Sequence, residues 1–247
     1  MEQIEGRHPV REALASGRPI RRVLVARSNR ESGTLTEIID LARRRQVNIE
    51  EVDPRWLDRM AHTRSHQGVI ALASARPTVD PDDILAAARG RGEPPLVLLL
   101  DGIEDPQNVG AIIRVAEAAG AHGVILPARR ASGLTPAVAK ASAGAIEYLP
   151  VAVVTNLART MTKLKQEGLW VLGADPDGED LYAADPAPAL AVVIGSEGRG
   201  LSRLVRESCD LLVRIPMRGR VASLNAATAA AVVLFELGRR QRQGAGG

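Results

Sequence analysis

From residue 95 onward, short apolar segments alternate with segments whose apolar residues recur at helical spacing, and this alternation constrains the fold most strongly. A strand followed by a helix and another strand predicts parallel pairing, because the helix carries the chain back to the same end of the sheet. Strands that are apolar on both faces indicate helices on both sides. The expected strands are 96–100, 123–126, 146–151, 169–172, 190–194 and 211–215, and the expected helices are 109–119, 135–142, 156–167, 202–208 and 224–239.

Residues 1–75 predict a smaller α/β unit ahead of this sheet. Leu35, Ile38 and Ile39 follow helical spacing, and Asp53-Pro54 is typical of a helix start. The expected order is helix 8–16, strand 20–26, helix 34–45, strand 47–52, a helix from Asp53-Pro54, and strand 68–73.

Between the two units, residues 75–95 hold four prolines and two glycines around one short helix at 81–89. This composition is typical of a domain boundary. We therefore expect three parts: a domain at 1–75, a linker at 76–94 and a second domain at 95–247.

Cysteine and histidine content limits the possible sites. Cys209 is the only cysteine, so the chain has no internal disulfide and no multi-cysteine metal site. The four histidines form no H-E-x-x-H pair, no apolar run approaches 18 residues, and the first ten residues lack a signal-peptide pattern. The sequence predicts a metal-free cytoplasmic protein without a membrane span.

The charge balance admits a polyanionic partner. The chain has 32 basic and 29 acidic residues, and its isoelectric point is about 9.5. Only three of the basic residues are lysines, and arginine suits phosphate and base edges, although base composition of the genome explains the bias equally well. With only five aromatic residues, the chain offers no platform for stacked bases, so any RNA contact is expected to be electrostatic.

Three loops that follow predicted strands contain unusual residues, and ligands bind at the carboxyl ends of parallel strands. They are 101–114, 195–201 and 215–225. Taken singly, each loop also has a structural explanation. Asn108, Ser223 and Asn225 suit helix caps, Arg114 suits a solvated helix face and Glu197 suits an ion pair.

The glycine pattern of the second loop argues against two nucleotide-binding classes. Residues 195–200 read G-x-x-G-x-G, which differs from the dinucleotide fingerprint G-x-G-x-x-G, and the phosphate-loop motif is absent. A nucleotide-dependent oxidoreductase is therefore disfavoured.

Together the three loops resemble the three sequence motifs of the SpoU (TrmH) family of RNA ribose 2′-O-methyltransferases, in the SPOUT superfamily. The first motif corresponds to Asn108–Arg114 and the second to Ile194–Leu201. The third is Ile215-Pro216-Met217 followed by Ser223-Leu224-Asn225. The resemblance covers about residues 95–240. Residues 1–75 look like the substrate-binding domain of a ribosomal-RNA branch, the 23S rRNA guanosine 2′-O-methyltransferases.

This resemblance implies a SPOUT-type parallel sheet with a C-terminal trefoil knot, preceded by a small α/β RNA substrate-binding domain. It also implies S-adenosylmethionine as cofactor, held largely by main-chain groups. The implied cofactor-binding residues are Gly195, Ile215, Leu224, Leu172, Gly173 and Ala174.

The implied reaction is methyl transfer from S-adenosylmethionine to a ribose 2′-hydroxyl. The resemblance assigns Arg114 to activation of that hydroxyl, with Asn108, Glu197, Ser223 and Asn225 orienting the arginine and the nucleotide. A guanidinium does not give up its proton in proteins, so we expect Arg114 to hold the ribose phosphate and stabilise the developing alkoxide.

The implied partners are large-subunit ribosomal RNA and a second copy of the chain in a homodimer. Two alternatives stay open: a tRNA ribose 2′-O-methyltransferase, and a non-catalytic RNA-binding factor of ribosome assembly with the same fold. The intact set of site residues argues against the second.

Overall fold

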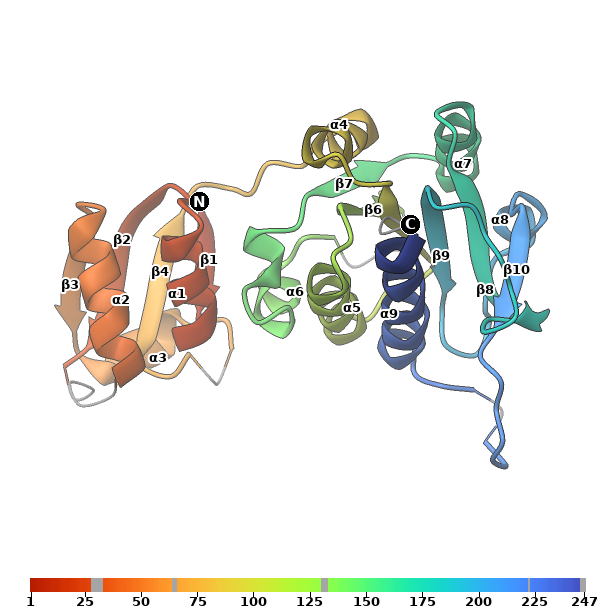
Figure 1. Cartoon of the computed structure of the whole chain (residues 1–247). Helices are drawn as coiled ribbons and strands as arrows, with labels where there is room; N and C mark the ends of the chain where they lie inside the picture. Colours follow the sequence, from red (N-terminus) through yellow and green to blue (C-terminus); the bar gives the residue numbers. More distant parts are fainter. Residues whose placement is uncertain (28–32, 64–65, 130–132, 222, 245–247) are drawn as a thin grey trace. The chain divides into compact units, whose positions relative to one another are not determined.

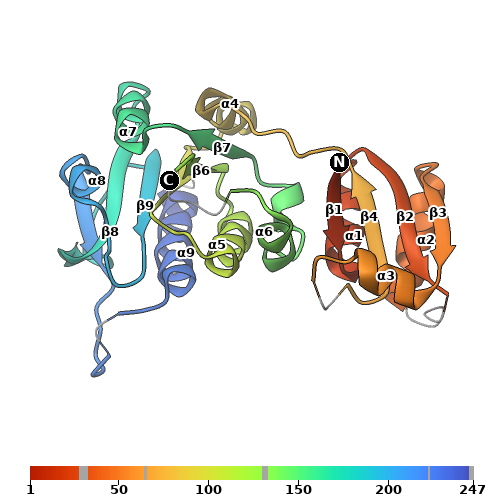
Figure 2. The same ribbon diagram turned by 180° about the vertical axis from the view of Figure 1, so that it is seen from behind.

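The structure is a computed structural model that describes residues 1–27, 33–63, 66–129, 133–221 and 223–244. The chain forms two compact units (Figures 1 and 2). One comprises Met1–Pro77 and Leu134–Tyr148, and the other comprises Thr78–Gly133 and Leu149–Gly247. Each unit is built around its own sheet.

The first unit has a four-stranded mixed sheet in the order β1-β4-β2-β3. β4 runs antiparallel to β1 and β2, whereas β2 and β3 are parallel. Its elements are β1 (Glu2–Glu5), α1 (Arg7–Ala15), β2 (Ile20–Ala26), α2 (Gly33–Arg44), β3 (Asn48–Val52), α3 (Pro54–Met60), β4 (Val69–Ala73), α6 (Pro136–Ala141) and the 3-10 turn η1 (Ala145–Glu147).

Alternate residues of β2 supply two separate cores in this unit. Val23 and Val25 pack with residues of α1 and α2, and Leu24 packs with Leu57 of α3. Successive side chains of a strand point to opposite faces, so helices cover both faces of the sheet. The α/β unit expected for the N-terminal region is present.

The second unit has a six-stranded sheet in the order β10-β8-β9-β5-β6-β7. Every strand pair in it is parallel, as the alternation of strands and helices predicts. Its strands are β5 (Leu96–Asp101), β6 (Gly123–Pro127), β7 (Val151–Val154), β8 (Trp170–Asp180), β9 (Leu190–Gly195) and β10 (Leu211–Arg214). The trefoil knot stays a prediction.

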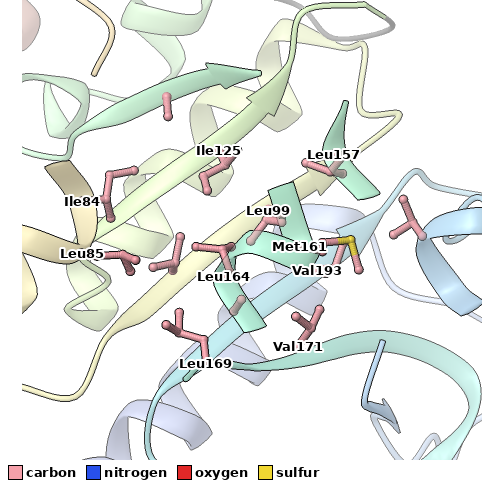
Figure 3. Close-up of a cluster of buried hydrophobic side chains, with 14 of the residues drawn as sticks. Ile84, Leu85, Leu99, Ile125, Leu157, Met161, Leu164, Leu169, Val171 and Val193 are labelled. Atoms are coloured by element: carbon pink, nitrogen blue, oxygen red, sulfur yellow. The ribbon is translucent and has the colours of Figure 1, made fainter. Parts of the chain in front are cut away.

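Helices cover both faces of this sheet. Leu85, Leu99 and Met161 belong to a core cluster formed with α4, α7 and α8 (Figure 3). Leu98 and Leu100 are also buried and point the other way, toward α5 and α9, which lie side by side (Figures 1 and 2). The helices are α4 (Pro81–Arg91), α5 (Pro106–Ala119), α7 (Leu157–Gln166), α8 (Arg203–Glu207) and α9 (Ala226–Gly244).

Several helices begin with a capping residue and a proline. Asp53, Asp105 and Thr135 each accept a hydrogen bond from a backbone N–H in the first turn, and each precedes a proline at the first helical position. Proline suits this position because its fixed φ is helical and it has no N–H to leave unpaired.

Three elements differ from the sequence-based expectation. β1 was not expected, and it pairs with β4 through Glu2–Glu5. Part of the strand expected at 146–151 is the 3-10 turn η1, and the strand β7 begins only after Pro150. β8 continues to Asp180, beyond the expected end at residue 172.

Two segments also group differently from the domain boundaries expected from composition. Helix α4 lies within the expected linker at 76–94, yet its Ile84 and Leu85 are buried in the core of the second unit. Residues 134–148 lie within the expected second domain, yet they group with the first unit.

Glu147 shows what holds this segment in the first unit. Its side chain is 3% exposed, and it accepts hydrogen bonds from Arg18, at 3.1 Å, and from Arg76. Burial lowers the pKa of Arg76, and the positive charge of Arg18 acts in the same direction, although the carboxylate of Glu147 opposes both. Tyr148 donates a 2.6 Å hydrogen bond to Glu12 of α1. The segment is therefore joined to the first unit by hydrogen bonds and ion pairs.

Candidate active site

The order of the strands in the second unit brings the three unusual loops together. Gly195 ends β9 and pairs with Asp101 at the end of β5, and β8 lies between β9 and β10. Because the strands are parallel, the segments after β5, β8, β9 and β10 all leave from the same edge of the sheet. The predicted site residues of these segments therefore share the carboxyl edge of the sheet.

Asn225 joins these loops through hydrogen bonds. Its Nδ2 donates to Asn108 Oδ1 at 2.8 Å and, over a longer distance of 3.4 Å, to Glu197 Oε2. Asn108, Glu197 and Asn225 come from the first, second and third loops respectively, and we call them the Asn225 cluster. Residues far apart in the sequence thus form one polar group at the edge of the sheet.

Asn225 also caps α9. Its Oδ1 accepts hydrogen bonds from the backbone N–H groups of Ala227, at 2.9 Å, and Thr228, at 3.4 Å. The structural and functional interpretations of this residue are therefore compatible, because the two atoms of one amide serve different partners.

Asn108 does not cap α5, and the sequence-based assignment of that role was wrong. The cap is Asp105, whose carboxylate accepts hydrogen bonds from the N–H groups of Gln107 and Asn108. Asp105 precedes Pro106, and this Asp-Pro pair was the available signal for the true start of the helix. The side chain of Asn108 is consequently available to Asn225.

Arg114 and Ser223 lie outside the hydrogen-bonded cluster. Arg114 is exposed on α5, and within the described part of the chain no hydrogen bond or ion pair joins its side chain to another residue. Ser223 is exposed immediately before Leu224, in the segment that leads to α9. An exposed guanidinium of this kind is suited to an anionic ligand.

The loop after β9 is closed by its own backbone. Ser196 and Gly200 exchange backbone hydrogen bonds of 3.1 and 2.9 Å, and a Cβ atom at Gly195 would lie 2.2 Å from the carbonyl carbon of Gly200. Gly195 therefore cannot be replaced without displacing the loop. Asp101 Oδ2 accepts a 2.6 Å hydrogen bond from Ser202 N–H just before α8. Asp101 is not among the residues expected at the site, although its position directly after an apolar strand was an available signal.

Ile215 and Leu224, two of the residues expected to bind S-adenosylmethionine, lie at the two ends of an irregular segment between β10 and α9. Within the described residues, the main-chain groups of 215–221, 223 and 224 make no hydrogen bond to another backbone group. Ile215 and Leu224 are half-buried, so they can cover an apolar part of a ligand as well. Free amide and carbonyl groups beside apolar side chains fit a nucleoside joined to an amino acid.

Leu172, Gly173 and Ala174 are consecutive residues of β8. Leu172 and Gly173 pair with β9 on one side and with β10 on the other. Ala174 begins the segment in which the pairing with β10 is interrupted. Leu172, Gly173, Ala174, Gly195 and Ile215 therefore lie on, or directly after, the neighbouring strands β8, β9 and β10, whereas Leu224 lies in the segment before α9.

The described residues contain neither a candidate metal site nor a candidate membrane span. No group of three or more His, Cys, Asp and Glu side chains is arranged to hold a metal ion. No helix among them combines the length and apolar character needed to cross a membrane.

Family models match both parts of the chain. Residues 95–235 match the SpoU rRNA methylase family, and residues 3–79 match the RNA 2′-O ribose methyltransferase substrate-binding domain. The first match contains all three loops and the Asn225 cluster.

Individual relatives cover nearly the whole chain. YacO of Bacillus subtilis (strain 168), assigned by its name to TrmH family tRNA/rRNA methyltransferases, is 45% identical over 97% of this chain and 96% of its own length. The crystal structure of the SpoU methyltransferase AviRb from Streptomyces viridochromogenes, in complex with the cofactor AdoMet, is 30% identical. It has a TM-score of 0.81 and covers 98% of this chain and 90% of that one.

A third relative matches only part of the chain. It was solved in a study of 2-OH methylation of C/U34 on tRNA, is 30% identical and has a TM-score of 0.53. The match covers 60% of this chain and 96% of that one. The family models and these relatives, which include the three loops, show that the chain belongs to the SpoU (TrmH) family and is an S-adenosylmethionine-dependent RNA 2′-O-methyltransferase.

Proposed function

We propose that this enzyme methylates the ribose 2′-hydroxyl of a guanosine in 23S ribosomal RNA, acting as a homodimer in the cytoplasm, where that RNA is assembled into ribosomes. The observation that carries the choice of ribosomal RNA is the N-terminal substrate-binding domain at residues 3–79. The relative that acts on tRNA aligns over 96% of its own length but over only 60% of this chain. The rest of this chain therefore has no counterpart in that relative.

The Asn225 cluster and Arg114 are proposed to act on the RNA. Arg114 would bind the phosphate next to the target ribose and stabilise negative charge as the 2′-oxygen loses its proton. The proton would pass to that phosphate or to water, since a guanidinium is not a base. Asn108, Glu197, Ser223 and Asn225 would orient the nucleotide, and in-line attack makes such positioning a large part of the rate.

The main chain of Gly195, Ile215 and Leu224, with Leu172, Gly173 and Ala174, would hold S-adenosylmethionine, which supplies a methyl group carried on a sulfonium. Gly195 lies in a closed loop, and Leu172 and Gly173 lie within the sheet, so these groups are fixed before the ligand arrives. Groups held in place in this way lose little freedom on binding.

A homodimer is supported by the character of α9. Its first turns are rich in alanine, and Phe235 is 48% exposed on the same helix. Small residues permit close helix packing, and an exposed aromatic residue is typical of protein interfaces.

A tRNA substrate is the second candidate, because the name of YacO includes both RNA classes. The discriminating experiment measures initial rates of labelled-methyl transfer to unmodified 23S ribosomal RNA and to unmodified bulk tRNA at one salt concentration. We expect transfer to 23S RNA to be at least tenfold faster. Faster transfer to tRNA would overturn the ribosomal assignment, and cofactor binding without transfer to RNA or to ribosomal particles would favour the non-catalytic alternative.

A further inference from the structure

The pairing of β8 with β10 contains a large interruption next to the proposed cofactor residues. Leu212 pairs with Gly173, but the next residue, Val213, pairs with Glu179. Residues 174–178 therefore project from the ladder as a bulge, and Ala174, one of the proposed cofactor residues, is its first member. A bulge re-aims the residues beside it, so its shape determines what Ala174 presents to a ligand.

Arg206 of α8 holds this bulge through two carboxylates. Its Nε donates to Asp175 Oδ2 at 3.0 Å, and its Nη2 donates to Asp177 Oδ2 at 3.1 Å. Asp175 Oδ1 also accepts the backbone N–H of Asp177 at 3.0 Å. The hydrogen bond and the charge of Asp175 raise the pKa of Arg206. Asp175 is 9% exposed, and a buried carboxylate requires a paired cation.

The other side of the bulge is fixed by close packing against β10. A Cβ atom at Gly178 would lie 2.5 Å from the backbone of Leu212 and Val213. Arg214 donates a 2.6 Å hydrogen bond to the carbonyl oxygen of Gly178. The last residue of the bulge is therefore held by β10, whereas its middle is held by Arg206.

Arg206 also connects the bulge to the loop after β9. Helix α8 follows that loop directly, and Asp101 fixes the backbone just before the helix through Ser202. A Cβ atom at Gly173 would lie 2.8 Å from Leu201 of the loop and 2.8 Å from Cys209 after the helix. The two segments proposed to bind S-adenosylmethionine are thus in contact, and Arg206 bridges them with charge-assisted hydrogen bonds.

We propose that Arg206 is a positioning residue for S-adenosylmethionine, because it binds Asp175 and Asp177 and thereby fixes the bulge that begins at Ala174. Loss of the guanidinium leaves the buried Asp175 with an unpaired charge, and the bulge must open to hydrate this carboxylate. The part of the proposed cofactor site formed by Leu172–Ala174 then changes its conformation, while the hydrophobic core of the sheet stays intact. This inference rests on the proposed placement of the cofactor.

The test compares Arg206→Met with Arg203→Met in the full-length protein. Arg203 lies on the same helix, its side chain is 89% exposed and its partner is Glu207. The measurements are the dissociation constants of S-adenosylmethionine and S-adenosylhomocysteine by titration calorimetry, together with the midpoint of thermal unfolding. We expect Arg206→Met to weaken both ligands at least tenfold and to lower the thermal midpoint by about 10 °C or less relative to the control, so that the variant is folded in the titration.

Two further variants separate positioning from general stability. Arg206→Lys restores one hydrogen bond, so we expect it to recover part of the lost affinity. Asp177→Asn changes a largely exposed carboxylate and should weaken S-adenosylmethionine about threefold. In steady-state assays, Arg206→Met should raise KM for S-adenosylmethionine more than it lowers kcat.

Each remaining outcome contradicts a different claim. Equal affinities in Arg206→Met and Arg203→Met would overturn the positioning role while leaving the cofactor site in place. If Arg206→Met does not fold, unchanged affinity in both Arg206→Lys and Asp177→Asn would overturn it instead. A wild-type chain that binds neither ligand would overturn the proposed cofactor site itself.

Discussion

Asn225 shows how one side chain serves both the fold and the reaction. Its oxygen caps α9 and its nitrogen binds Asn108 and Glu197. Sequence motifs could identify these residues as a group, but they could not identify their partners, since Asn108 also resembled a helix cap. The side chain of Asp105 took that role because it lies directly before Pro106.

The dual role of Asn225 predicts that the two functions can be separated. Serine is as good a helix cap as asparagine, but its hydroxyl is too short to reach Asn108. We expect Asn225→Ser to retain the unfolding free energy within about 0.5 kcal/mol, and Asn225→Ala to lose about 1 kcal/mol. Both should reduce methyl transfer at least tenfold. Urea denaturation and single-turnover rates measure the two effects, and full activity in Asn225→Ser would count against the cluster.

Arg114 is expected to act on RNA and not on the cofactor. Arg114→Ala should lower methyl transfer by a factor of about 100 or more, which is the usual cost of removing a charge-stabilising donor. The dissociation constant of S-adenosylmethionine should stay within twofold of the wild-type value. Arg159→Ala, at an exposed position on α7, is the matched control. If calorimetry shows that Arg114→Ala weakens S-adenosylmethionine binding as strongly as it slows methyl transfer, Arg114 acts on the cofactor and the assignment to RNA is wrong.

At the scale of elements, hydropathy could predict the strands and helices that bury continuous apolar faces, and it failed where pairing depends on distant residues. β1 is short and carries Glu2 and Glu5, so its pattern resembles a loop until β4 pairs with it. The sequence does not predict that β8 continues past residue 172, because Glu179 and Asp180 pair with β10 only beyond a bulge.

Helix α9 carries a charged clamp whose effect depends on pH. Hydrogen bonds from Arg239 and Arg240 lower the pKa of Glu236 to about 2. Arg240 in turn donates to the carbonyl oxygens of Leu181 and Tyr182. A carboxyl group whose pKa is lower in the folded state stabilises the fold above its unfolded pKa of about 4.3, and this stabilisation is lost as pH falls toward 2.

Replacing Glu236 should therefore change the acid profile of stability. We expect Glu236→Gln to lower the thermal midpoint by a few degrees at pH 6, and the difference from wild type should shrink between pH 4 and pH 2.5. Scanning calorimetry across this range checks the prediction, with Glu207→Gln as the surface control. A difference that stays constant with pH would show that the pKa of Glu236 is not lowered.

At the scale of the whole molecule, composition could indicate two units but not their boundaries. The helix expected at 81–89 is present as α4, but the prolines and glycines around it indicated a linker, whereas Ile84 and Leu85 belong to the core of the second unit. Residues 134–148 join the first unit through buried ion pairs, and no local pattern reports a partner more than 50 residues away.

The Glu147 ion pairs are expected to stabilise the first unit strongly. Removing one partner of a buried ion pair leaves an uncompensated charge and costs about 3 kcal/mol or more. Glu147→Gln would leave Arg18 and Arg76 together, and both side chains are almost fully buried. Glu50→Gln, which breaks an exposed pair with Arg22, should cost less than about 1 kcal/mol. Equal effects of the two variants in denaturant unfolding would contradict this grouping.

The most direct test of the whole account is the chemical position of the transferred methyl group. RNA labelled with S-adenosylmethionine carrying a radioactive methyl group is hydrolysed in alkali, which cleaves only next to a free 2′-hydroxyl. We predict label in alkali-resistant dinucleotides from 23S ribosomal RNA, with none above background for Arg114→Ala. Label in mononucleotides would mean that a base is methylated, and it would contradict the assignment of Asn108, Arg114, Glu197 and Asn225 to a ribose-directed site.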